Sequence, residues 1–135
     1  MMPTPPPDGA RIAALAVLAA PGLPQCEVTY LLAGDSAPGD GFGHALAVSA
    51  GNAIVGAPRD DDAGLDAGAA YVFRRGLDGR WNQVQKLVPA GLSAGDEFGV
   101  SVSIAGGVAV IGAHLDDERG TDAGAAYVYE LGPCL

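Results

Sequence analysis

The chain contains the stretch GAPRDDDAGLDAGAAYVF at residues 56–73 and the closely similar stretch GAHLDDERGTDAGAAYVY at residues 112–129. A constant offset of 56 residues relates the two stretches. Aligned without a gap, residues 39–73 and 95–129 agree at 18 of 35 positions. Such a repeat indicates two copies of one supersecondary unit, which limits the folds that the chain can adopt.

Composition favours short strands over long helices. The chain has 135 residues, of which 49% are hydrophobic, enough to bury one core. Charged residues make up 17%, and there are 21 glycines and 10 prolines, which is typical of a protein with many turns. The net charge of -9 with only seven Lys and Arg residues predicts repulsion of a phosphate backbone, so nucleic acid is excluded as a partner.

Residues 1–26 differ in character from the rest and are expected to be a disordered or signal-like segment. A proline-rich lead precedes a nine-residue apolar run at residues 12–20. That run is too short to span a membrane, which takes about 20 residues. It fits the apolar centre of a secretory signal and predicts a secreted or cell-envelope protein. The alternatives are an apolar helix or disordered segment with no targeting role, and lipidation at Cys26.

Periodicity predicts four strands in the repeated unit. Leu46 and Val48 alternate with small residues, which is the period-two pattern of a strand, and an Ala-Gly pair follows that suits a hairpin turn. The next run is apolar on both faces and is expected to be covered on both sides. The strands are expected at residues 45–49, 53–57, 69–73 and 80–88, with copies of the first three at 100–104, 109–113 and 125–129.

The repeated residues resemble the FG-GAP repeat, which occurs in the β-propellers of integrin α-subunits and in many bacterial extracellular proteins. Phe42-Gly43 and Gly56-Ala57-Pro58 match its motif in full. The second copy keeps Phe98-Gly99 and Gly112-Ala113, with His114 where proline is expected. The resemblance covers Leu31 to Tyr129 and implies an all-β fold of four-stranded antiparallel propeller-type blades.

The strand order predicts an incomplete propeller. Residues 27–32 align with residues 83–88, so the chain reads as fourth, first, second and third strand, twice over. The domain expected at residues 27–135 then contains repeats at about 31–86 and 87–135. Two blades cannot close a ring of about four to eight. The alternatives are closure by homo-oligomerisation, with the N-terminal strand completing the last blade, folding back as a small sandwich, or a fragment of a longer repeat protein.

Acidic residues gather between the second and third strands of each copy. The integrin-type calcium loop lies between the first two strands, and this chain has no carboxylate there. The acidic loops offer closely spaced oxygens, which calcium prefers, although Asp and Gly also form ordinary turns. The candidate metal ligands are Asp60, Asp61, Asp62, Asp66, Asp116, Asp117, Glu118 and Asp122.

Catalytic and cofactor-binding residues are not expected. His44 aligns with Val100 and His114 with Pro58, so neither histidine belongs to the repeated pattern. No motif places a nucleophile beside either histidine, and loop carboxylates stay ionised in water. The chain is therefore predicted not to be an enzyme.

Two cysteines, Cys26 and Cys134, lie near the ends of the chain. If residues 27–32 complete the last blade, both cysteines fall at one short connection, where an oxidising compartment would favour a disulfide. Two unpaired thiols are the alternative.

These features predict an extracytoplasmic, non-enzymatic binding or scaffold module that contacts a protein or glycan through propeller loops. The alternatives are a secreted hydrolase or its accessory piece, and a structural remnant of a longer repeat protein.

Overall fold

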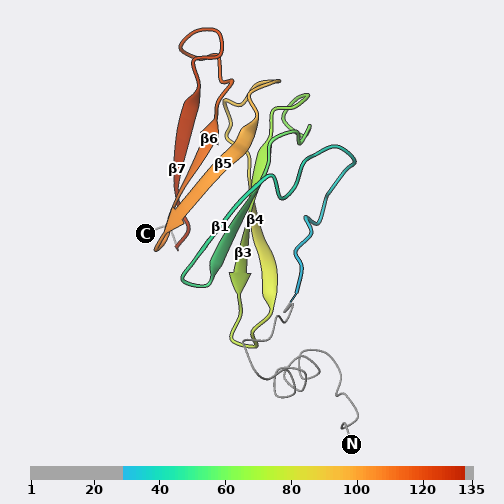
Figure 1. Cartoon of the computed structure of the whole chain (residues 1–135), viewed down its shortest axis with the longest axis vertical. Helices are drawn as coiled ribbons and strands as arrows, with labels where there is room; N and C mark the ends of the chain where they lie inside the picture. The colour runs from blue at the N-terminus through green and yellow to red at the C-terminus, as the bar shows by residue number, and fades with distance from the viewer. Residues whose placement is uncertain (1–28, 133–135) are drawn as a thin grey trace, which may run out of the picture. The chain divides into compact units, whose positions relative to one another are not determined.

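The computed structural model describes residues 29–132, and these form seven strands and no helix (Figure 1). The strands make two antiparallel sheets, which we call blade 1 and blade 2. The all-β prediction is confirmed. Blade 1 has the order β1 (Ala45–Ser49), β2 (Asn52–Ala57), β3 (Ala69–Arg75) and β4 (Trp81–Leu87), and blade 2 has the order β5 (Phe98–Ala105), β6 (Val108–Ala113) and β7 (Ala125–Glu130).

The hairpin between β1 and β2 turns at the two residues that the sequence indicated. Ala50 has φ 49° and Gly51 has φ 79°. Positive φ at both central residues is the geometry of a turn whose twist matches that of the paired strands. Ser49 then pairs with Asn52, and this register places Ala47 beside Ile54 on one face of the sheet.

The two blades stack face to face, and the repeat explains how. The face of blade 1 that carries Ile54 and Val72 packs against the face of blade 2 that carries Ile111 and Tyr127. The second pair is not the repeat equivalent of the first, since Ile111 corresponds to Val55 and Tyr127 to Tyr71. Each blade therefore has two different faces, and one face of blade 2 covers the opposite face of blade 1.

The stacking brings the two backbones into direct contact. A Cβ atom added to Gly56 would fall on the carbonyl oxygen of Gly99, and one added to Gly68 would fall on that of Phe98. Three backbone hydrogen bonds join the same segments, from the N–H groups of Gly95, Glu97 and Phe98 to the carbonyls of Leu65, Asp66 and Ala67, at 2.8 to 3.1 Å. The glycines of the repeat therefore make room for the next blade.

Blade 2 has three strands among the described residues, and the predicted N-terminal fourth strand is not one of its members. Thr29–Leu32 belong to no strand. Further along, the N–H group of Gly34 donates to Gln83 of β4, so the chain enters the blades beside β4. Thr29–Leu32 therefore do not complete blade 2 of their own chain, and completion of the last blade of another copy stays a prediction.

Residues 1–26, Cys26 and Cys134 lie outside the described residues, and with them the predictions of an export signal, lipidation and a disulfide. In residues 29–132 there is no helix that is long and apolar enough to cross a membrane.

We predict that Gly56→Ala is severely destabilising and that Gly112→Ala is not. The added methyl group at Gly56 meets the backbone of Gly99, which cannot move without separating the blades, and such overpacking costs about 3 kcal/mol. Gly112 is the repeat equivalent, where the methyl group meets only the side-chain oxygen of Ser101, which can rotate. Urea unfolding of both variants gives the two free energies. Equal losses would contradict the role given to the contact between the blades.

Candidate functional site

The loops between β2 and β3 and between β6 and β7 have the same internal geometry. Asp60 is buried and accepts hydrogen bonds from the Tyr71 hydroxyl at 2.9 Å and from the N–H group of Asp62 at 3.0 Å. In blade 2, buried Asp116 accepts from the Tyr127 hydroxyl at 3.0 Å and from the N–H group of Glu118 at 2.9 Å. The buried carboxylate thus fixes the loop in both copies.

A second carboxylate in each loop also binds backbone. Asp61 accepts a hydrogen bond from the N–H group of Asp66 at 2.8 Å, and Asp117 accepts one from that of Asp122 at 2.6 Å. Asp66 and Asp122 have φ near 53° and 52°, a left-handed conformation that aspartate tolerates better than most residues. Much of the acidic repetition is therefore explained by loop geometry.

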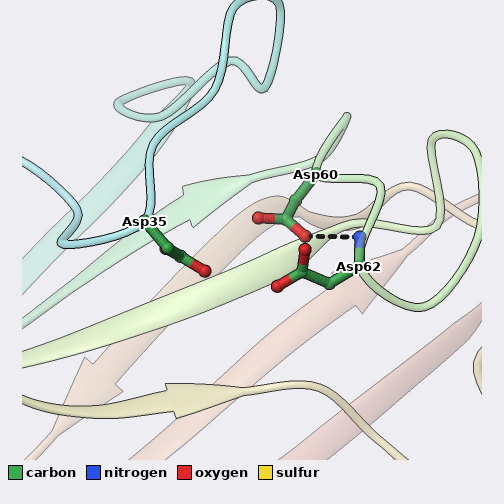
Figure 2. A group of neighbouring side chains, drawn as sticks. All are labelled: Asp35, Asp60 and Asp62. Carbon is green, nitrogen blue, oxygen red and sulfur yellow. Dashed lines mark hydrogen bonds between the residues drawn. The ribbon is translucent and has the colours of Figure 1, made fainter.

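Blade 1 adds a third element to its loop. Asp35, from the segment before β1, lies close to Asp60 and Asp62, and one oxygen from each carboxylate is within 4.8 Å of the other two (Figure 2). Among residues 29–132 this is the one group of three acidic side chains close enough to share a metal ion. Such a grouping of like charges requires a cation to balance it.

Lys86 of β4 supplies that cation. Its Nζ atom lies 2.5 Å from Asp35 Oδ2 and 3.0 Å from Asp60 Oδ2, and it also pairs with Asp62. The side chain of Lys86 is mostly buried and its ammonium lies over the Tyr71 ring, 5.3 Å from the centroid. A protein cation therefore already stands where a metal ion would bind three oxygens.

The protonation states follow from these contacts. Burial disfavours the charged form of Lys86, but the hydrogen bonds that Lys86 donates to Asp35, Asp62 and Asp60 outweigh it and raise the pKa of Lys86. Hydrogen bonds from Lys86 and Tyr71 lower the pKa of Asp35. Burial, with hydrogen bonding to Asp35 and Asp60, raises the pKa of Tyr71. At neutral pH Lys86 is therefore protonated and Asp35 ionised, and the two form an ion pair.

Blade 2 repeats the acidic loop without the cation. Gly91 stands at the position equivalent to Asp35, and the described part of blade 2 has no strand at the position equivalent to β4. A hollow of about 430 Å³ lies there, lined by Gly91, Ser93, Asp96, Asp116, Asp117 and Glu118. Burial and the Asp116 carboxylate raise the pKa of Tyr127 to about 12, so its hydroxyl remains a donor. Blade 2 thus presents an acidic hollow at its outer edge.

Both acidic loops lie at the same end of the two blades, together with the connection from β4 to β5 (Figure 1). The opposite end includes the hairpin between β3 and β4, with Arg74, Arg75 and Arg80. The end with the acidic loops is therefore the one suited to a cationic ligand.

The predicted site residues have separate roles in the structure. Asp60 and Asp62 join Asp35, which the sequence reasoning missed, and the other predicted carboxylates lie in the loops described above. Lys86 was also missed, because its pairing with Asp60 joins residues 26 positions apart and occurs in one copy only. His114 Nε2 lies 2.8 Å from Glu97 Oε2, and His44 is exposed. Calcium binding by these loops stays a prediction.

Comparison with known proteins identifies the repeat. The family model described as FG-GAP repeat matches residues 26–73 and again residues 81–129. No curated protein matches the sequence.

We predict that Lys86→Gln lowers the free energy of unfolding by about 2 to 4 kcal/mol, because it leaves buried Asp60 without its cation. Arg80→Gln, in the segment just before β4, is the matched control. Its pair with Asp78 is exposed at both ends, and its loss costs less than about 1 kcal/mol. Urea unfolding at neutral pH measures both, and equal small effects would contradict the ion-pair network.

The lowered pKa of Asp35 predicts an acid dependence. A carboxyl group whose folded pKa lies below its unfolded value stabilises the fold above the unfolded pKa, and this stability is lost as pH falls through the folded pKa. We expect the free energy of unfolding to decrease from about pH 5 downward, and to decrease less in Lys86→Gln, in which the main cause of the shift is absent. Urea unfolding between pH 7 and 3 tests this, and parallel curves for the two proteins would refute it.

Proposed function

The chain belongs to the FG-GAP repeat family, and we propose that it is a non-enzymatic binding or scaffold module that works outside the cytoplasm and completes its propeller by head-to-tail association of copies. The observation that carries the proposal is the pair of open blade faces. Each of them is the repeat equivalent of a face that is covered within the chain.

The first open face is on blade 2. Ile54 and Val72 of blade 1 are 0% and 1% exposed under blade 2, whereas their equivalents Val110 and Val128 are 39% and 67% exposed. The second open face is the β1 side of blade 1, where Leu46 and Val48 are 71% and 68% exposed, while Val55 and Tyr71 farther across the same face are buried. Val102, the equivalent of Leu46, is packed against the core. The open face of one copy is thus built to receive the other open face of the next copy.

Backbone groups on the open faces support the same arrangement. The N–H groups of Gly95, Glu97 and Phe98 bond to the loop of blade 1, and their equivalents are those of Gly39, Gly41 and Phe42. The matching acceptors are the carbonyls of Thr121, Asp122 and Ala123. If a second copy stacks on the first as blade 2 stacks on blade 1, these three N–H groups of one copy can donate to the three matching carbonyls of the other.

The ligand face of the module is the end that carries the acidic loops. Stacked blades would place successive copies of these loops side by side, which concentrates negative charge on one rim. A basic surface of a protein, or a glycan bound by loop carboxylates and backbone groups, suits such a rim. The role outside the cytoplasm rests on the family, whose members include extracellular proteins, and on the apolar run at residues 12–20.

We predict that Leu46→Glu and Val128→Glu each prevent association and that the two variants restore one interface when mixed. Each substitution buries a charge in a different open face. Leu46→Glu keeps the intact face of blade 2, and Val128→Glu keeps the intact face of blade 1. Light scattering should therefore find a larger discrete assembly for the unmodified chain, a monomer for each variant, and a heterodimer for the mixture.

The mixture distinguishes the two kinds of interface. A head-to-tail interface uses blade 1 of one copy and blade 2 of the other. A mixture of the two variants therefore still offers one interface in which both faces are unaltered. An interface that paired identical faces would leave one variant associated and the other monomeric. An unmodified chain that is monomeric at all concentrations would refute assembly between copies.

A further inference from the structure

The outer edge of β7 and the acidic hollow beside it form a second candidate site, distinct from the open faces. We propose that this edge is an acceptor for an extended segment of a partner protein, which adds as a fourth strand and places a lysine in the hollow. In blade 1 the equivalent site is occupied by β4 and Lys86.

In blade 1 the fourth strand is present, and its contacts define what the site accepts. β4 pairs antiparallel with β3, and Lys86 lies opposite Tyr71 in the register. This position brings the Lys86 ammonium to Asp60 and Asp62, and Leu87 is buried in the core. Backbone pairing, one apolar contact and one lysine are thus the three elements of recognition.

Blade 2 presents the same acceptors with the strand position open. Tyr127 and Asp116 make the hydrogen bond that Tyr71 and Asp60 make, and the two distances are 3.0 and 2.9 Å. Glu118 occupies the position of Asp62. Alternate residues of β7 are half-buried and exposed, whereas the first five residues of β3 are buried. The acceptor is therefore already formed, and among residues 29–132 no strand pairs with the outer edge of β7.

Charge selects a lysine-bearing segment over the N-terminal segment of a second copy. A strand that pairs with β7 as β4 pairs with β3 places its lysine opposite Tyr127, within reach of Asp116 and Glu118. Residues 27–32 would place Tyr30 there and would bring Glu27 toward an edge that is already acidic. An ammonium desolvated among carboxylates forms charge-assisted hydrogen bonds, which a tyrosine or glutamate cannot replace.

The experiment uses fluorescein-labelled peptides and the full chain. The probe has the sequence of residues 80–88, RWNQVQKLV, and the comparison peptide carries glutamine in place of its lysine. We expect fluorescence anisotropy to show saturable binding of the probe, and the glutamine peptide to bind at least about tenfold more weakly. Added salt should weaken the binding of the probe. Amide resonances of Ala125–Glu130 should shift on binding. A peptide of residues 27–33 should bind more weakly than the probe.

Matched variants locate the site. Glu118→Gln should weaken the binding of the probe severalfold. Asp62→Asn, the equivalent substitution in blade 1, should leave probe binding unchanged. Both side chains are exposed, and in Asp62→Asn Lys86 keeps its pairs with Asp35 and buried Asp60, so the ion-pair network of blade 1 is retained; urea unfolding of both variants checks that they are folded. Sensitivity to Asp62→Asn alone would mean that the probe exchanges with β4, and would overturn the proposal. Equal binding of the lysine and glutamine peptides, tighter binding of the peptide of residues 27–33, or no binding at all would overturn it equally.

Discussion

The close approach of two backbones between the blades is the constraint on which the rest of the structure depends. Gly56 and Gly68 of blade 1 lie against Gly99 and Phe98 of blade 2 at separations that leave no room for a Cβ atom. With the blades this close the Phe98 ring is fully buried, and within blade 2 it lies edge-on to Tyr127, 5.2 Å away between centroids. In blade 1 the equivalent Phe42 makes the same edge-on contact with Tyr71 at 5.4 Å, but it is only half-buried because no blade covers it.

The stacking joins unlike faces of the two blades rather than equivalent ones. This property determines which blade face stays uncovered at each end of the pair. A unit that covers its neighbour with one face always leaves the other face for the next unit. Leu46 and Val128 are exposed because each lies on the side of its blade that the other blade does not cover. The same logic gives the acidic loops one common direction, because every blade has the same orientation relative to its predecessor.

The sequence predicted the features that recur and missed those that occur once. Alternation and the Ala-Gly turns located the strands of both copies because pleating and positive φ are local constraints. The repeat also located the acidic loops, although it could not separate carboxylates that hold backbone, such as Asp61, from those that meet a cation. Asp35 and Lys86 have no repeated partners, since Gly91 stands at the position equivalent to Asp35, so comparison of the copies gave them no weight. Thr29–Leu32 form no strand within the chain for a related reason: similarity to β4 establishes a pattern and not a pairing partner.

The difference between the two copies is what gives blade 2 its chemistry. Asp116 is as buried as Asp60, yet its described partners are a hydroxyl and a backbone N–H group, whereas Asp60 also has an ammonium. Burying a carboxylate opposed only by dipoles is less favourable than burying one paired with a cation, because dipoles replace the lost hydration incompletely. Any cation that enters the hollow therefore relieves an existing cost as well as making new contacts. Because stability and binding are linked, a segment that supplies this cation stabilises blade 2 by an amount that grows with the ratio of its concentration to its Kd.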